Sequence, residues 1–175
     1  MIGFNGGLIG VSKVYTTESP NAGVWTLDEH IYPRRTSKFR YVRWTITANR
    51  SNPGSTQMAE FNIRLGSTNI DMSSFSVTDS PNTVTGAPVT NLKDNNLNTK
   101  WAFIETLPVS AIFDMSSGIA FDGYRWYTAN DEPGRDPVSW IVSGSNNGTN
   151  YETLHTVINY SVTTTRLAEV GPFSF

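Results

Sequence analysis

The stretch GYRWYTANDEPGRDPVSWIVSGSNNGTNYETLHTV, residues 123–157, gives the clearest indication of the fold. Two short segments in it alternate apolar and polar residues, which is the side-chain period of a β-strand. The residues that share a face are Tyr124, Trp126 and Thr128 in the first segment and Val138, Trp140 and Val142 in the second. The clusters NDEPGRDP and GSNNGTN follow these segments and are typical of turns. The stretch therefore predicts short strands joined by polar loops.

The same two-residue period recurs earlier in the chain, in YVRWTIT (41–47) and AEFNIRL (59–65). The predicted buried faces are Val42, Trp44 and Ile46 in the first segment and Ala59, Phe61, Ile63 and Leu65 in the second, with Glu60, Asn62 and Arg64 on the opposite face. No window of helical length carries an apolar stripe of period 3.6. We therefore expect an all-β domain over residues 38–175, as a sandwich or a barrel.

Residues 1–37 differ in composition and are expected to form an N-terminal arm. The segment GFNGGLIG is too rich in glycine for the centre of a strand. One interpretation is a free terminus. Against it, the arm carries large apolar side chains that are costly to expose to water, which favours packing on its own domain, a neighbouring subunit or a partner. These side chains are Phe4, Leu8, Ile9, Trp25, Leu27, Ile31 and Tyr32.

Composition narrows the functional classes. The chain has 175 residues, a net charge of −2 and no cysteine. The charge argues against a nucleic-acid binder, which would carry a basic face, and the lack of cysteine excludes disulfides. No stretch reaches the roughly 20 apolar residues of a membrane helix. The N-terminus lacks the features of a secretory signal, so export by the general pathway is not expected.

The segment KDNNLNTKWAFIE, residues 93–105, has the ligand spacing of an EF-hand calcium loop, beginning at Asp94 and ending at Glu105. Two features argue against that assignment. Thr99 stands where the loop needs glycine for its sharp turn, and prolines flank the segment where helices are required. An EF-hand is therefore not expected, and Glu105 is not expected to be a ligand.

The residues instead resemble a known family. NLKDNNLNTKW is similar to the A-x-D-G-x-x-x-T-x-W segment of discoidin-like domains, the galactose-binding-like jelly roll also found in carbohydrate-binding modules. VSAIFDM is similar to that family's W-I-x-Y-D-L-G strand, and residues 123–157 resemble its long R-x-P-x-x-W-x-L-x-G-S-N-D-G run. The motif that normally ends the family, Y-x-R followed by I-S-E-I-E, lies at residues 40–65. The resemblance implies a circularly permuted, discoidin-like jelly-roll β-sandwich.

In that family the aspartate loop and the glutamate of S-E-I often meet around one calcium ion. Carried over by residue, the resemblance implies a structural Ca²⁺ held by Asp94, Asn96, Thr99 and Glu60, with backbone carbonyls completing the shell. The usual D-G is D-N here, and Asn95 tolerates the left-handed backbone that the turn requires. The alternative is a turn without an ion, in which Asp94 accepts hydrogen bonds from backbone N–H groups.

The arm resembles the N-termini of tailed-phage virion proteins, notably those of phages of aquatic bacteria, through MIGFNGGLIG and GVWTLDEH. This resemblance implies a virion structural protein, either a capsid cement or decoration protein or a tail or baseplate component. It would be assembled in the host cytoplasm, bound through the arm to other virion proteins, and present as a homo-oligomer. The alternative is a carbohydrate-binding module that recognises a host surface glycan.

Catalysis is not expected. His30 and His155 are isolated, and no metalloprotease, nucleophile-elbow, P-loop or Rossmann motif is present. Tryptophans often form sugar platforms, but Trp101, Trp126 and Trp140 fall on strand positions and are expected in the core.

Two interpretations are open for Arg135, in the loop PGRDP. It either faces a ligand or pairs with a nearby carboxylate, such as Asp131, Glu132 or Asp136. The second is the more usual outcome for an arginine in such a loop.

Overall fold

The computed structural model describes residues 37–51, 54–79, 84–104 and 106–175. The chain divides into two units, residues 1–35 and residues 36–175, and all described residues belong to the second. Apart from Ser37, the predicted arm lies outside the described residues. So do its seven named apolar residues, Phe4, Leu8, Ile9, Trp25, Leu27, Ile31 and Tyr32.

The described residues form strands for the most part, so the all-β prediction is confirmed. The strands are β1 (Ser37–Asn49), β2 (Thr56–Met58), β3 (Phe61–Leu65), β4 (Thr68–Asn69), β5 (Ser76–Asp79), β6 (Trp101–Phe103), β7 (Val109–Phe121), β8 (Gly123–Tyr127), β9 (Pro137–Ser145), β10 (Glu152–Val157) and β11 (Glu169–Ser174). Two short 3-10 helices accompany them, η1 (Val89–Lys93) and η2 (Pro133–Arg135).

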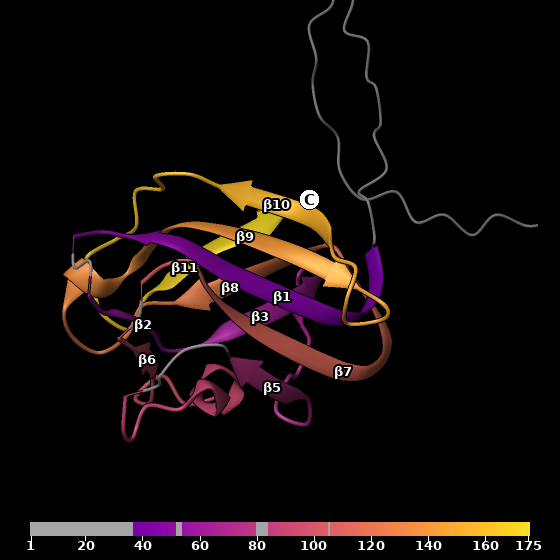
Figure 1. Cartoon of the computed structure of the whole chain (residues 1–175), viewed down its shortest axis with the longest axis horizontal. Coiled ribbons are helices and arrows are strands. Elements are labelled where there is room, and N and C mark those ends of the chain that lie inside the picture. Colours follow the sequence, from indigo (N-terminus) through magenta and orange to yellow (C-terminus); the bar gives the residue numbers. More distant parts are fainter. Residues whose placement is uncertain (1–36, 52–53, 80–83, 105) are drawn as a thin grey trace, which may run out of the picture. The chain divides into compact units, whose positions relative to one another are not determined.

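The strands pair antiparallel in two main sheets and one short ribbon (Figure 1). The larger sheet has the order β10-β9-β1-β7-β5, the smaller one β11-β8-β3-β4, and the ribbon joins β2 to β6. The long strand β1 has an inner position between β7 and β9. At its centre Trp44 lies opposite Ala111 of β7 and Val142 of β9.

The two main sheets face each other across an aromatic core. Trp44 of β1 stacks on Phe61 of β3, with ring centroids 4.9 Å apart, and Phe61 stacks on Phe113 of β7 at 5.3 Å. Trp126 of β8 contacts Trp44 at 5.8 Å. Because these rings come from both sheets, their packing joins the sheets into a β-sandwich.

Most predicted faces are confirmed. The residues predicted to face inward that are buried are Val42, Trp44, Ile46, Ala59, Phe61, Ile63, Tyr124, Trp126, Thr128, Trp140 and Val142. Trp101 is also fully buried, so the three tryptophans weighed as sugar platforms are core residues.

Strand β3 departs from the predicted alternation at both ends. Leu65 is 41% exposed, because it is the last residue of the strand and precedes the turn at Gly66. On the opposite face Glu60 and Asn62 are buried. The residues around Asn96 cover that face, so it is not a solvent face as a simple alternation predicts.

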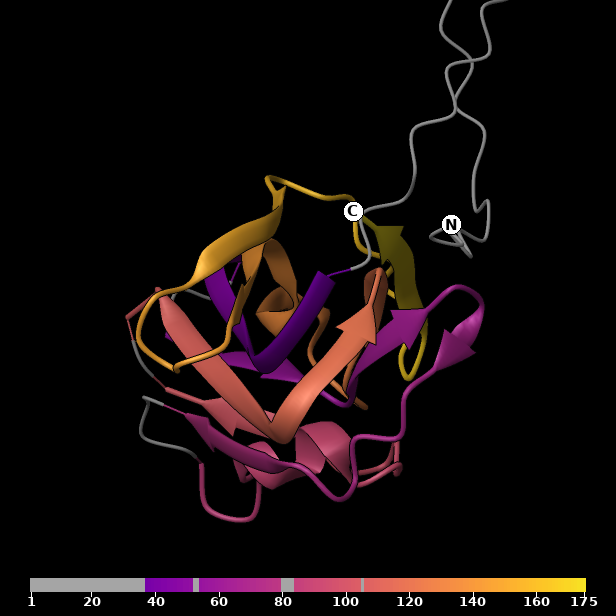
Figure 2. The same cartoon turned by 90° about the vertical axis from the view of Figure 1, so that its right-hand side faces the viewer.

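The sandwich has two different ends. At the entry end, defined by Phe39, Phe121 and Phe175, the first and last strands meet. Phe39 and Phe175 each contact the Phe121 ring, with centroids 6.4 and 5.7 Å apart, and Figures 1 and 2 show the C-terminus close to the start of β1. At the loop end, the far end of β1, the Arg50 and Ser51 amides donate to carbonyls of the loop that holds η2.

Candidate functional site

The predicted ion loop, residues 94–99, follows η1 and is a compact turn. Asn95 has a φ of 58°, so this asparagine adopts the left-handed conformation expected of it. Asp94 Oδ1 accepts the Asn96 N–H at 2.9 Å, and Asp94 Oδ2 lies 2.7 Å from the Thr99 hydroxyl. The Thr99 hydroxyl is also 2.7 Å from the Asn96 carbonyl oxygen. The backbone capping by Asp94 that the ion-free alternative requires is therefore present.

Glu60 meets this loop from a distant part of the chain. It precedes β3, is 2% exposed, and its Oε1 accepts the Asn96 N–H at 3.0 Å. Its Oε2 is buried and has no hydrogen-bond partner among the described residues. The structure thus brings together the residues predicted as ligands: Glu60, Asp94, Asn96 and Thr99.

The Asp94 carboxyl group acts on Glu60. Burial and, after it, the neighbouring Asp94 carboxyl group together raise the pKa of Glu60 to about 8, against the opposing effect of the Asn96 amide. A buried carboxylate beside a second carboxylate is unfavourable unless positive charge compensates it. Either a proton on Glu60 or a bound cation can provide this charge.

The residues fit a calcium ion. No group of three or more His, Cys, Asp and Glu side chains that could hold a metal occurs within the described ranges. Ligands beyond the two carboxylates must therefore be amide, hydroxyl or carbonyl oxygens, which suit Ca²⁺ rather than zinc. Glu60 Oε2 offers an unengaged oxygen. A hollow of about 160 Å³ adjoins Glu60 and is lined by Glu60, Asn62, Asn95, Leu97, Arg125 and Tyr127.

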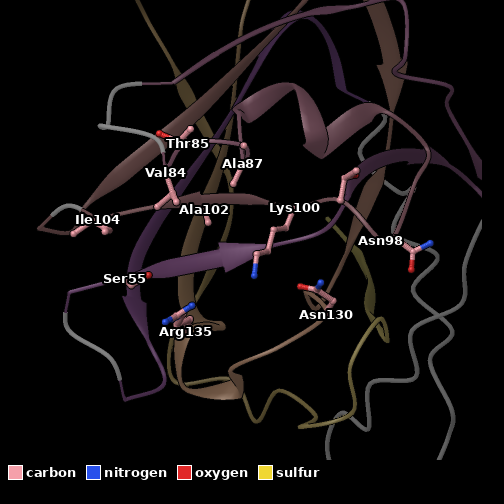
Figure 3. Close-up of a pocket in the computed structure, with 12 residues that line it drawn as sticks. Ser55, Val84, Thr85, Ala87, Asn98, Lys100, Ala102, Ile104, Asn130 and Arg135 are labelled. Carbon is pink, nitrogen blue, oxygen red and sulfur yellow. The ribbon is translucent and has the colours of Figure 1, made fainter.

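A larger pocket, the loop-end pocket, lies beside this turn and has a volume of about 460 Å³. It is lined by Ser55, Val84, Thr85, Gly86, Ala87, Asn98, Thr99, Lys100, Ala102, Ile104, Asn130 and Arg135. Figure 3 shows the apolar residues Val84, Ala87 and Ala102 on one side and Lys100, Asn130 and Arg135 on the other. Among the described residues, the lining contains two cationic side chains and no carboxylate.

The carboxylates near Arg135 bind other cations. This bears on whether Arg135 faces a ligand or pairs with a carboxylate. Both oxygens of Asp131 bind Lys100 Nζ, at 2.7 and 2.8 Å. Asp136 is buried and binds Arg166 through both of its oxygens, with Arg50 at 3.6 Å. Among the described residues Arg135 forms no ion pair or side-chain hydrogen bond with these carboxylates, and its Nε is buried without a hydrogen-bond partner. Its charge still acts on Asp131: against the effect of burial, hydrogen bonds from Lys100 and Gln57 and the charges of Lys100 and Arg135 lower the pKa of that carboxyl group.

Residues from distant segments hold the Arg135 loop in place. The fully buried Gln57 donates through Nε2 to the Asp131 carbonyl at 2.6 Å, and Arg166 donates to the same oxygen at 2.8 Å. Arg50 Nε donates to the Pro133 carbonyl at 3.0 Å. The sequence does not mark these residues as parts of the site, because a polar residue near a loop does not reveal its partner.

The described residues include no helix with the length and apolarity needed to span a membrane. No protein-family model, curated protein or solved structure matches the chain. The fold and site define a β-sandwich with a candidate ion turn and a cationic pocket at its loop end. Any more particular function is a proposal from these residues and their geometry.

Proposed function

We propose that the chain is a structural protein of a phage virion, either a capsid cement or decoration protein or a tail or baseplate component. In this proposal the arm attaches the protein to the particle, and the sandwich faces outward or bridges subunits. The main supporting observation is that the two ends of the sandwich differ. The strand that follows the arm begins at Ser37, at the entry end, whereas the loop-end pocket is lined in part by Ser55, which follows the last residue of the same strand, Asn49.

An apolar arm suits attachment because it adds buried area on a neighbour without altering the core of the sandwich. Among the described residues, the core cluster runs from Phe39 to Phe175 and draws on both main sheets. Virion positions are related by symmetry, which favours repeated copies and homo-oligomeric contacts. The proposed partners are other virion proteins, with assembly in the host cytoplasm and no role for nucleic acid, a membrane or catalysis.

The proposed fold is a circularly permuted, discoidin-like jelly roll. Two observations support it. Strand β1 has an inner position between β7 and β9, although it comes first in the sequence. The rings of Phe39 and Phe175 converge on Phe121, and permutation requires chain ends that lie close together. One structural Ca²⁺ at Glu60 and Asp94 belongs to the same proposal.

The attachment proposal is tested by deleting residues 1–37 and measuring incorporation into particles in competition with the full chain. We expect the truncated protein to stay folded, because its core is intact, and to be absent from particles. Truncated protein that assembles at full occupancy would overturn the proposal.

A second function, recognition of a host surface glycan, is favoured by the loop-end pocket. Its volume lies within the range of small-molecule sites, and it combines apolar and polar lining residues. A glycan array probed with the full chain tests this function. Reproducible binding to any glycan supports it, and a blank array counts against it.

A further inference from the structure

We propose that the loop-end pocket binds an acidic sugar unit and that Arg135 holds its carboxylate group. This inference rests on the second proposed function, glycan recognition, and is independent of attachment to a virion. It adds the chemical class of the ligand and the residue that selects it.

The charge of the pocket favours an acidic ligand. Of its two cations, Lys100 is neutralised by Asp131, which binds it with both oxygens. The Arg135 side chain makes no hydrogen bond or ion pair with a described residue, its Nε is shielded from water, and its charge lies near Asp131, whose oxygens bind Lys100. A buried N–H without a partner is unfavourable, and a carboxylate relieves this through two parallel hydrogen bonds from the guanidinium.

Hydrogen bonds within the protein fix the backbone around Arg135. The Asp136 amide donates to the Pro133 carbonyl, and the Ser51 amide donates to the Gly134 carbonyl at 2.9 Å. Next in sequence, the buried Asp136 is fixed by Arg166. Because the backbone at Arg135 is already ordered, only its side chain loses conformational freedom on binding, so more of the interaction energy appears as affinity.

The remaining lining matches a sugar body rather than a small inorganic anion. Beside Arg135, the pocket presents the Asn130 amide and the Ser55 hydroxyl, which are suited to sugar hydroxyl groups. Ala87 and Ala102 on the other side offer a small apolar surface for the C–H face of a ring (Figure 3). The volume of about 460 Å³ also exceeds what a bare anion requires.

The test is calorimetric titration of the full chain with trigalacturonic acid and, separately, with its fully methyl-esterified form. The ester keeps the sugar skeleton and removes the charge, so this comparison needs no variant. We expect the acid to bind and the ester to bind at least about tenfold more weakly, as follows from loss of a charge-assisted hydrogen-bond pair. Equal binding of acid and ester, or no binding of the acid, would overturn the proposal.

The residue assignment is tested with Arg135→Gln and Arg135→Lys. We expect Arg135→Gln to bind trigalacturonic acid at least about tenfold more weakly. Arg135→Lys should keep part of the affinity, because lysine keeps the positive charge but cannot donate two parallel hydrogen bonds to one carboxylate. The matched control is Arg64→Gln, since the Arg64 side chain donates to the Ser67 carbonyl and Arg64 is not among the residues that line the pocket. An unchanged affinity in Arg135→Gln, with the thermal midpoint of the parent chain, would overturn the assignment.

The glycan array separates this inference from the function on which it rests. Binding restricted to neutral glycans would leave glycan recognition standing and contradict the acidic ligand. An array without any binding would contradict both glycan recognition and the acidic ligand. Neither result bears on incorporation into particles.

Discussion

Glu60 carries a buried carboxyl group beside the Asp94 carboxyl group, and this pair makes the 94–99 turn a candidate ion site. In the absence of an ion, burial and Asp94 hold the pKa of Glu60 near 8. A divalent cation between the two groups would remove their repulsion and engage the unpaired Glu60 Oε2. The same turn is stable as a hydrogen-bonded loop, so the ion is expected to add stability rather than to create the fold.

We therefore predict that calcium raises the unfolding temperature of the full chain by about 5–10 °C at a hundredfold excess over Kd. In Glu60→Gln this shift should vanish, because glutamine keeps the size of the side chain but not its charge. Differential scanning calorimetry with calcium and with chelator measures it. The matched control is Asp71→Asn, since Asp71 bonds to Asn95 from outside the turn. A midpoint insensitive to both calcium and chelator would contradict the site.

His155 gives the sandwich a pH dependence. Its Nδ1 is hydrogen-bonded to the Tyr124 hydroxyl at 2.8 Å, and burial lowers the pKa of His155 from its usual 6.5. Between the folded-state pKa and 6.5, the unfolded chain binds more protons than the folded one. The stability from this residue is therefore present above pH 6.5 and is lost as the pH falls through that window.

We predict that His155→Asn flattens the loss of stability on acidification below pH 6.5. Asparagine can accept the Tyr124 hydroxyl bond but does not titrate. Urea unfolding at several pH values, in a His30→Asn background that leaves His155 as the only histidine, measures the effect. An unchanged pH profile in His155→Asn would show that the dependence arises elsewhere.

At the scale of the element, strand β3 presents two apolar residues with different surroundings. Phe61 stacks against rings of both sheets, whereas Leu65, at the end of the same strand, is 41% exposed. We predict that Phe61→Ala lowers the free energy of unfolding by about 3–5 kcal/mol. Leu65→Ala should lower it by roughly 1 kcal/mol or less. Equal effects in chemical denaturation would contradict the assigned burial.

The strands were predictable from the sequence because their side chains alternate with a period of two. The buried faces around Trp44, Phe61 and Trp126 follow from that period alone, and the left-handed turn follows from Asn95. The exposure of Leu65 was not predictable, because alternation does not show where the opposite sheet ends.

The environment of Arg135 was the least predictable feature. Its loop holds three acidic residues, so local sequence favours a local ion pair. In the structure, Asp131 binds Lys100, 31 residues earlier, and Asp136 binds Arg166, 30 residues later. These contacts join segments that are distant in the sequence and that only the complete fold brings together, so no local pattern encodes them. The meeting of Glu60 with the 94–99 turn is equally distant, and only the family resemblance indicated it.

At the scale of the whole molecule, the sandwich separates two proposed tasks. Its first and last strands converge at the entry end, around Phe121, while the loop-end pocket is lined in part by Ser55, which follows the opposite end of β1 in the sequence. A protein that is attached through its first residues and exposes a binding surface elsewhere needs this arrangement. Each task can be removed without the other, by truncation of residues 1–37 or by substitution of Arg135.

The most direct measurement of the central proposal is the amount of this protein in purified phage particles, determined by quantitative mass spectrometry against the major capsid protein. We predict a fixed stoichiometry, on the order of a dozen copies per particle for a tail or baseplate component and hundreds for a capsid decoration. Particles that are infectious and free of the protein, or copy numbers that vary between preparations, would contradict a structural role in the virion.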